Sequence, residues 1–349
     1  MNRRRYEWPC AATFGCEKWD AAFCSRPLAI WHHRPGQPIF VNSKTKFPLQ
    51  GVVVSLNTPF DESAKIDYRA LDRLIHLHLA GGAAGFLMPA QAAEVNALTL
   101  DERLELIRFV QQTVAGRALF IAGATAPEEK ESFRAAETAV AAGCGGVLVE
   151  IPARCLAGRR ATLDFVRSFA AAGMPMLMLQ DLDWSGPGLP VPWIVEMFET
   201  IEAFRCLKVE VRPAGPKYTA VLEATNGRLH VSGGWAADQM VEALDRGVDV
   251  YMPTAMTGLY RAVIDAHRAG DRERARHIFH QILPVLAFTR QHLDISIQFY
   301  KRLYHRRGIF STTLTRKAVL PYDRYHESYG NELIAYLDRI ETDSRRAAP

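Results

Sequence analysis

Eight short apolar runs, each followed by a longer amphipathic stretch, constrain the fold of this chain more than any other feature of its sequence. Parallel strands that are covered on both faces are typically apolar throughout, and apolar residues at helical spacing are typical of the crossover helices between them. The expected strands span residues 51–56, 85–88, 119–122, 146–150, 176–180, 206–210, 229–232 and 248–252. The expected helices include residues 67–80, 101–114, 127–142 and 161–172.

Local signals mark the starts and ends of several of these helices. Thr99 followed by Glu102 is typical of a capping box at a helix start. Gly81, Gly143 and Gly173 each follow a helical stretch, and glycine commonly ends a helix. The boundaries therefore agree with the periodicity.

The repeated alternation favours a closed barrel over an open sheet, because no glycine-rich dinucleotide loop follows the first strand. We therefore expect an α/β fold, a (β/α)8 TIM barrel over residues 48–270. Residues 271–349 lose the alternation and predict a C-terminal helical region packed on the barrel. Its expected helices span residues 272–288, 297–305 and 331–341. Residues 1–47 show neither strand nor helix period, which favours a poorly ordered N-terminal extension.

Composition and charge exclude several classes of function. The net charge of +4, from 42 basic and 38 acidic residues, is too small and scattered to indicate nucleic-acid binding. No apolar run approaches the roughly 18 residues that a membrane span requires. The six cysteines lack metal-ligand spacing and are interpreted as reduced thiols of a cytoplasmic protein, and no metal or other cofactor is expected.

Lys208 is the most informative residue of the barrel pattern. It interrupts the expected strand 206–210, which is otherwise apolar up to Glu210. A buried ammonium group is costly, so it calls for either an ion pair or a chemical role. Side chains alternate along a strand, so Lys208 and Glu210 face the same way, and a structural ion pair between them remains an alternative to catalysis. A neutral lysine could instead attack a carbonyl group and form an imine.

In TIM barrels the reacting groups lie at the C-terminal ends of the strands and in the loops that follow. Besides Lys208 and Glu210, this rule selects a set of polar residues. They are Thr58, Gln91, Glu94, Gln180, Asp181, Asp183 and Tyr251.

The order of motifs resembles the dihydrodipicolinate synthase / N-acetylneuraminate lyase family of Schiff-base barrels, over about residues 50–310. The motifs are Thr58-Pro59-Phe60, residues 85–94 and 98–103, Ile121-Ala122-Gly123, residues 142–147, Lys208 and Ser232-Gly233-Gly234. The resemblance implies that Lys208 is the imine-forming lysine. It also implies a homo-oligomer, a tetramer or a dimer.

This chain departs from the family pattern at two places. Characterised aldolase members carry Gly-Thr-Thr-Gly-Glu after the second strand, where hydroxyl groups and backbone amides hold the carboxylate of pyruvate and relay protons. Here that stretch is Ala90-Gln91-Ala92-Ala93-Glu94, which leaves the amides, including that of Ala92, and the side chain of Gln91 as donors. The catalytic tyrosine at the end of strand five is replaced by Gln180, which cannot carry a proton as a phenol does.

Three residues are candidates to replace the tyrosine. Glu210 is the first, although an ionised carboxylate beside Lys208 favours the ammonium form and slows imine formation. Asp181 is the second, with a polar loop residue as its alternative interpretation. Tyr251 could supply a phenol from strand eight. Glu94 is expected either to contact the substrate or to brace its own loop.

The leading hypothesis is a class I lyase that acts on a 2-oxo acid, such as pyruvate or a keto acid derived from a sugar acid. Lys208 would form the imine, followed by aldol cleavage, aldol condensation or dehydration. Because the tyrosine and threonines are replaced, the alternative is a family member that binds a ligand or regulates without catalysis.

Overall fold

The computed structural model describes residues 45–235, 238–318 and 320–346. Residues 1–44, which make up nearly all of the expected N-terminal extension 1–47, lie outside the described residues. Within the described part, no helix is both long and apolar enough to cross a membrane. The same part contains no group of three or more His, Cys, Asp or Glu side chains arranged to hold a metal ion.

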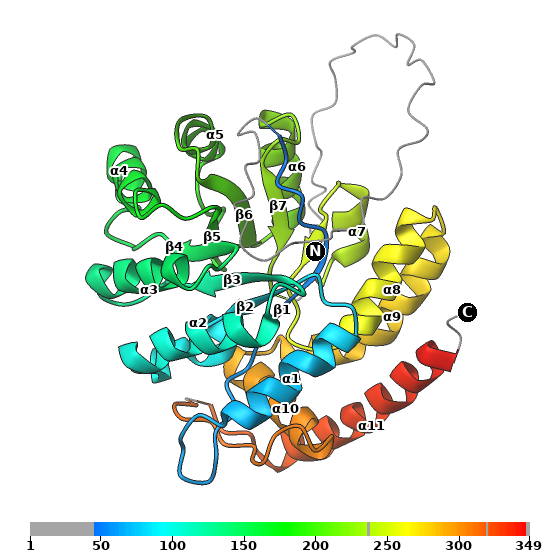
Figure 1. Ribbon diagram of the computed structural model, residues 1–349. Coiled ribbons are helices and arrows are strands. Elements are labelled where there is room, and N and C mark those ends of the chain that lie inside the picture. The colour runs from blue at the N-terminus through cyan, green and yellow to red at the C-terminus, as the bar shows by residue number, and fades with distance from the viewer. Residues whose placement is uncertain (1–44, 236–237, 319, 347–349) are drawn as a thin grey trace, which may run out of the picture. The chain divides into compact units, whose positions relative to one another are not determined.

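Eight parallel strands form a closed barrel in chain order, in which each strand pairs with the next and β8 pairs with β1 (Figure 1). This confirms the expected TIM barrel. The strands are β1 (Gly51–Ser55), β2 (Gly85–Met88), β3 (Leu119–Gly123), β4 (Gly146–Glu150), β5 (Leu177–Asp183), β6 (Phe204–Val211), β7 (His230–Gly233) and β8 (Val250–Tyr251).

The helices around the barrel begin and end close to their sequence signals. They are α1 (Tyr68–Ala80), α2 (Leu100–Val114), α3 (Glu129–Ala141), α4 (Arg159–Ala170), α5 (Val191–Thr200), α6 (Ala214–Ala224), α7 (Met240–Asp245) and α8 (Thr257–Arg268), and two short 3-10 turns, η1 (Gln91–Ala93) and η2 (Val95–Ala97), follow β2. Thr99 and Glu102 form the expected capping box of α2. Gly143 and Gly173 adopt positive φ angles of 78° and 80° after α3 and α4. After α1 the positive φ belongs to Gly82 instead of Gly81.

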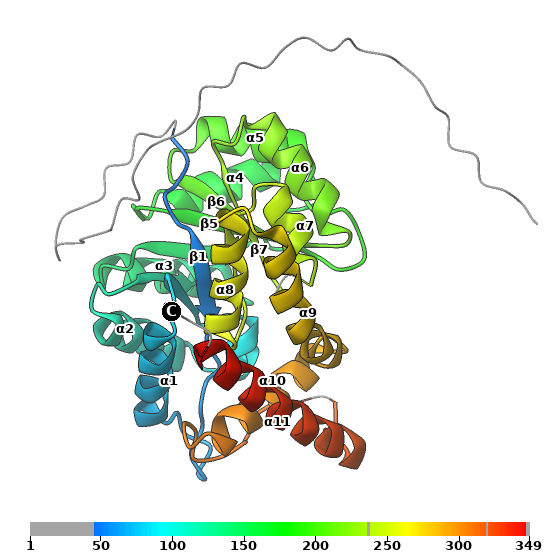
Figure 2. The same ribbon diagram turned by 90° about the vertical axis from the view of Figure 1, so that its right-hand side faces the viewer.

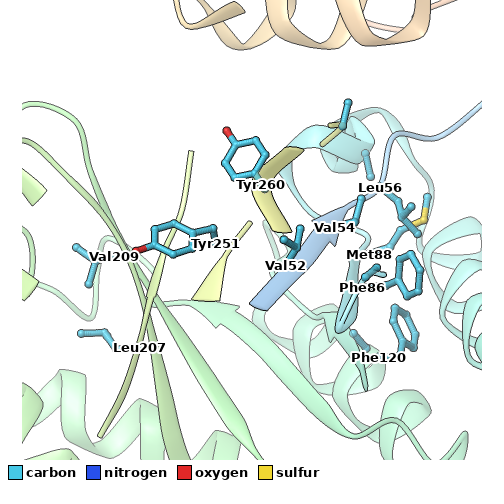
Figure 3. Close-up of a cluster of buried hydrophobic side chains, with 14 of the residues drawn as sticks. Val52, Val54, Leu56, Phe86, Met88, Phe120, Leu207, Val209, Tyr251 and Tyr260 are labelled. Carbon is cyan, nitrogen blue, oxygen red and sulfur yellow. The ribbon is translucent and has the colours of Figure 1, made fainter. Parts of the chain in front are cut away.

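Strand alternation divides the apolar residues into two cores. Leu87, Leu148, Met178 and Cys206 fill the inside of the barrel. The other face of each strand packs against the helices in a larger cluster, part of which Figure 3 shows around Val52, Phe86, Phe120 and Leu207. Because Cys206 points inward, the alternation of β6 sends Lys208 and Glu210 inward as well.

The structure changes the expected lengths of three strands. β5 and β6 pair from Leu177 opposite Phe204 to Asp183 opposite Val211, so both extend past their expected ends. β8 is shorter than expected and spans only Val250 and Tyr251. On either side of it, the carbonyl oxygen of Asp249 accepts the N–H of Gly51 in β1, and the N–H of Met252 donates to the carbonyl oxygen of Gly233 in β7. The long β5–β6 ladder carries its side chains further toward the mouth of the barrel.

Three C-terminal helices, α9 (Arg272–Thr289), α10 (Leu293–Arg306) and α11 (Arg324–Arg346), gather beside α1 and α8 (Figure 2). α11 begins seven residues earlier than the expected residue 331. Its start signal is Asp323, whose carboxylate accepts the backbone N–H groups of Tyr325 and His326 at 3.0 and 2.9 Å. Gly330 lies within this helix, where a Cβ would lie 2.2 Å from the hydroxyl oxygen of Tyr322.

Candidate active site

The C-terminal ends of β4, β5 and β6 bring polar side chains together inside the barrel. Glu150 on β4 pairs with Gln180 on β5, which pairs with Lys208 on β6. Residues paired across parallel strands face the same side of the sheet, and Leu148 and Cys206, two residues earlier on β4 and β6, both lie in the inner core. Glu150, Gln180 and Lys208 therefore form one inward row across three adjacent strands.

Lys208 is paired with a carboxylate at the bottom of this site. Its Nζ lies 3.2 Å from Glu210 Oε2, and the two side chains are only 6% and 7% exposed. The amide of Gln180 also donates to Oε2 of Glu210, and the backbone N–H of Trp235 donates to its Oε1 at 2.8 Å. Both oxygens of Glu210 are therefore occupied by donors. Gly234 permits this arrangement, since a Cβ there would lie 2.3 Å from Glu210 Cγ.

The structure thus brings together Lys208, Glu210 and Gln180, the three residues expected to be catalytic. It also has the ion pair between Lys208 and Glu210 that the sequence left open as an alternative. The chemical roles of the three residues remain predictions, because an ion pair and a reacting lysine share this resting geometry.

Glu150 is a polar residue of this site that sequence reasoning missed. Its backbone N–H donates to Thr125 Oγ1 at 2.9 Å. In the part of the chain that the structure describes, its carboxyl group has neither a hydrogen bond nor an ion pair. Burial raises the pKa of Glu150, the charge of Glu210 raises it further and Lys208 opposes the shift. The signal was available, because a glutamate that ends an apolar strand is as anomalous as Lys208.

A pocket of about 970 Å³ adjoins Glu210 at the mouth of β6 and β7. The rings of Trp184 and Trp235 meet edge to face in its lining, with their centroids 4.1 Å apart. Arg212 and Arg290 also line it. Arg290 donates to the carbonyl oxygen of Trp235 at 2.7 Å, and its ion pair with Asp238 holds the guanidinium group in place.

The loop after β2 retains two backbone donors. Asn57 and Thr58, which follow β1, donate to the carbonyl oxygens of Ala92 and Ala93, both at 2.7 Å. Within the η1 turn the N–H groups of Ala93 and Glu94 are already bonded. Among the described residues, the N–H groups of Gln91 and Ala92 make no backbone hydrogen bond and are open to a ligand. Thr58 is fully buried and positions this loop, and its expected role as a substrate contact stays a prediction.

The contacts of Glu94 match the second of its two expected roles, that of a brace for its loop. Its carboxylate is paired with Lys301 of α10 and accepts the backbone N–H of Arg316 at 2.8 Å. Lys301 lies 4.3 Å from the centroid of the Phe60 ring and also donates to Leu314 O at 2.7 Å. Glu94 therefore joins its loop to the C-terminal region, and its alternative role as a substrate contact stays a prediction.

Asp181 faces away from the barrel interior. Its neighbour Gln180 points inward, so strand alternation turns Asp181 outward, where it pairs with Lys217 at 3.1 Å and accepts the N–H of Leu189 at 2.7 Å. Asp183 accepts the N–H groups of Ser185 and Gly188, both at 3.1 Å. Both aspartates brace the loop after β5, which matches the alternative interpretation of Asp181 as a polar loop residue, and its substrate contact stays a prediction.

Tyr251 is also turned outward, beside Val209 in the cluster between strands and helices (Figure 3). Its hydroxyl group donates to the carbonyl oxygens of Val248 and Met240, at 3.1 and 3.3 Å. Its inward neighbour on β8 is Val250. The substrate contact expected of Tyr251 stays a prediction that its outward position does not support. Asp181 and Tyr251, the two candidates after Glu210 to replace the tyrosine, therefore both point away from Lys208.

Comparison with known proteins decides the family. The model of the dihydrodipicolinate synthetase family matches residues 48–337. The chain belongs to the dihydrodipicolinate synthetase family. The expected resemblance is thereby confirmed, and with it membership of a family of class I Schiff-base lyases that depend on pyruvate.

Individual relatives of the family are distant. The chain is 33% identical over 109 residues to 4-hydroxy-tetrahydrodipicolinate synthase of Sorangium cellulosum (strain So ce56), covering 31% of this chain but only 36% of that protein. The first curated relatives are thus matched over about a third to a half of their length. The crystal structure of dihydrodipicolinate synthase from Aquifex aeolicus has a TM-score of 0.74 at 20% identity and covers 83% of this chain and 98% of that one.

A second solved structure of the family contains a ligand. It is YagE, a prophage protein of the dihydrodipicolinic acid synthase family from E. coli K12, in complex with pyruvate. The TM-score is 0.76 at 17% identity, with 84% of this chain and 99% of that one covered. At such identity the likeness establishes the shared barrel, and the substrate of this family member has to be argued from its own site.

Proposed function

We propose that this chain is a class I lyase in which Lys208 condenses with the keto group of a 2-oxo acid. The observation that carries the proposal is the buried lysine at the end of β6, which points into the barrel beside Glu210 and a pocket of about 970 Å³. A buried cation is costly, and a lysine sheltered from water is suited to imine chemistry. Family membership supports the same reaction type.

The ion pair with Glu210 suggests how the amine becomes reactive. Transfer of one proton over the 3.2 Å from Lys208 Nζ to Glu210 Oε2 leaves a neutral amine and a neutral acid. The nitrogen lone pair then attacks the keto carbon, and the carbonyl oxygen takes one proton from the amine nitrogen and one from the acid form of Glu210 and leaves as water as the C=N bond forms. The resulting iminium withdraws electrons from C3, which aldol cleavage, aldol condensation and dehydration all require.

We infer that the substrate carboxylate binds the free N–H groups of Gln91 and Ala92. The replaced threonines supply no hydroxyl groups there, so the backbone amides and the side chain of Gln91 are the donors left. The pocket beyond Glu210 is large for pyruvate alone and combines two indole rings with Arg212 and Arg290. The carboxylates of Glu210, Asp238 and Glu242 also line this pocket. Its mixture of charged groups favours a longer, polar 2-oxo acid, such as one derived from a sugar acid, over pyruvate as the complete substrate.

Borohydride trapping tests the proposal. The protein is incubated with pyruvate, 2-oxobutanoate or 2-oxo acids derived from sugar acids, reduced with sodium borohydride and digested for mass spectrometry. We expect a reduced adduct on Lys208 and none when Lys208 is replaced by methionine. An unmodified Lys208 with every 2-oxo acid would rule out the proposed function.

The rival function is that of a binding or regulatory protein that has kept the barrel without its chemistry. Both carboxylate oxygens of Glu210 already have donors, namely Lys208, Gln180 and the backbone N–H of Trp235. An ion pair held in this way favours the rival function. The two functions differ in one readout. A protein that binds a 2-oxo acid in calorimetry but never forms the Lys208 adduct fits the rival.

We further propose that the protein is a cytoplasmic homo-oligomer, a tetramer or a dimer. Cys144, Cys155 and Cys206 of the described part are free and buried, as expected for a reducing compartment. Tyr325 and Tyr329 at the start of α11 are 67% and 47% exposed, which leaves aromatic surface for a second copy to cover. Sedimentation velocity measures the assembly, and a monomer at micromolar concentration would contradict it.

A further inference from the structure

The proposed lyase reaction requires a group that carries a proton to and from C3 of the bound 2-oxo acid. Gln180 stands at the end of β5, but an amide does not exchange protons at useful rates. Glu210 already receives donors from Lys208, Gln180 and Trp235. Asp181 and Tyr251 face away from the barrel interior. None of the candidates chosen from the sequence is therefore both close to the bound substrate and free to exchange a proton with C3.

We propose that Glu150 is the acid–base residue of this site. This inference rests on the proposed function, since it assigns the proton transfer that follows imine formation at Lys208. Glu150 ends β4, points inward in the same row as Gln180 and Lys208, and lies two strands away from Lys208. Neighbouring strands are about 4.8 Å apart, so roughly 10 Å separates the two backbones and leaves room for the substrate between the two side chains.

The surroundings of Glu150 suit this role. Its carboxyl group has no hydrogen-bond or ion-pair partner within the described residues, whereas the carboxylate of Glu210 is held by three donors. The groups that face it are Lys208 and Glu210 from β6, Gln180 from β5 and Thr125 from the loop after β3. Desolvation is the main cause that raises the pKa of Glu150, with a smaller contribution from Glu210. A raised pKa brings a carboxyl group closer to the range in which it both accepts and returns protons.

The step itself balances without any further reactant. In the iminium formed by pyruvate, the carboxylate of Glu150 takes a proton from C3. The electrons of that C–H bond form the C2=C3 bond of an enamine, and those of the C=N bond return to nitrogen. Protonation of C3 by the same carboxyl group reverses the step, so protons at C3 exchange with solvent.

Deuterium exchange tests this assignment separately from imine formation. The full-length protein, Glu150→Gln and Glu150→Asp are incubated with pyruvate in D₂O, and loss of the C3 proton signal is followed by NMR. In parallel, the adduct at Lys208 is trapped with borohydride. We expect Glu150→Gln to keep the adduct but to exchange C3 protons about 100-fold more slowly or worse, and Glu150→Asp to recover part of the rate.

The pH profile and a matched control sharpen the result. The wild-type exchange rate should rise with pH through a midpoint above the usual range of a glutamate, and Glu150→Gln should lack this rise. Glu137→Gln, an exposed glutamate on α3, should behave as wild type in both assays. Exchange by Glu150→Gln within about threefold of the wild-type rate, in a protein that still forms the adduct, overturns the role of Glu150. Absence of an adduct in the wild type, with pyruvate and with the other 2-oxo acids, overturns the proposed function and the role of Glu150 with it.

Discussion

Two buried lysine–glutamate pairs lie on different sides of this barrel, and their surroundings differ. Lys208 and Glu210 come from one strand, β6, beside a pocket and the unpaired carboxyl group of Glu150. Lys301 and Glu94 come from α10 and the loop after β2, and Phe60 covers the lysine. Burial lowers the pKa of Lys301 to about 8, against the opposing effect of Glu94.

The contrast shows that burial of a lysine does not by itself mark a reactive group. Lys301 is the more enclosed of the two lysines, with 1% of its side chain exposed against 6% for Lys208. It has a backbone acceptor in Leu314, a carboxylate and an aromatic face. The pairs differ in their surroundings: Glu210, the partner of Lys208, lines the pocket at the mouth of β6 and β7, whereas neither Lys301 nor Glu94 lines that pocket.

The largest expected effect comes from removing the lysine on the pocket side. Lys208→Met should abolish the borohydride adduct and reduce C3 exchange by about a thousandfold or more, because no other amine is placed to form the imine. Circular dichroism should show the fold retained, since Gln180 and Trp235 still donate to Glu210. If Lys208→Met gave as much borohydride adduct as wild type, at another lysine, the prediction that Lys208 alone forms the imine would be wrong.

The next effect concerns stability on the enclosed side. Lys301→Met leaves the charge of Glu94 buried without its partner and should lower the free energy of unfolding by about 3–5 kcal/mol, measured by urea denaturation. The folded fraction should still form the adduct at Lys208. The double variant Lys301→Met/Glu94→Gln is the control, and it should recover part of the loss because the stranded charge is gone. An equal free energy of unfolding in wild type and Lys301→Met would mean that the pair of Lys301 and Glu94 does not stabilise the fold.

A smaller, pH-dependent effect is expected from His78, which ties α1 to α8 and α10. It is hydrogen-bonded to Thr257 Oγ1 at 2.8 Å and to the hydroxyl group of Tyr304 at 3.0 Å. Burial lowers its pKa from 6.5 to about 3, so below pH 6.5 the unfolded chain binds a proton that the folded chain does not. Its contribution to stability is present above pH 6.5 and is lost as the pH falls toward 3, at about 1.4 kcal/mol per pH unit, or about 2 kcal/mol at pH 5.

The His78→Asn variant should therefore show a shallower loss of stability between pH 6.5 and 4 in urea denaturation. Part of the dependence should persist, because burial also lowers the pKa of His230 to about 4. His76→Asn is the matched control on the same helix, since His76 is exposed and should leave the slope unchanged. An identical slope in wild type and His78→Asn would contradict the prediction.

The smallest effect is expected from an exposed ion pair at the mouth of the barrel. Arg154 and Glu129 are paired, but their side chains are 54% and 42% exposed. Arg154→Ala should change the free energy of unfolding by less than about 0.5 kcal/mol, and adduct formation with pyruvate should not change. A clear drop in adduct formation would instead indicate that Arg154 contacts the ligand, and the site would then extend to the loop after β4.

Much of the fold followed from local pattern. The apolar runs predicted all eight strands, and the capping box at Thr99 and Glu102 predicted the start of α2 to within one residue. The side of the barrel that Lys208 and Glu210 face followed from alternation along one strand. The same alternation, applied to β5, would have shown that Gln180 and Asp181 cannot both point inward.

The sequence by itself determined the barrel and the lysine at its centre, because strand and helix periods and the spacing within one strand are local properties. Only the tertiary structure decided which carboxyl groups surround that lysine. The place of Glu150 depends on the register of β4, β5 and β6, and a shift of one residue would turn it outward. Glu94 forms an ion pair with Lys301, and Asp181 forms one with Lys217. No local sequence pattern specifies either partner. Such pairings arise only when distant segments pack and exclude water, which makes an unpaired charge too costly to leave.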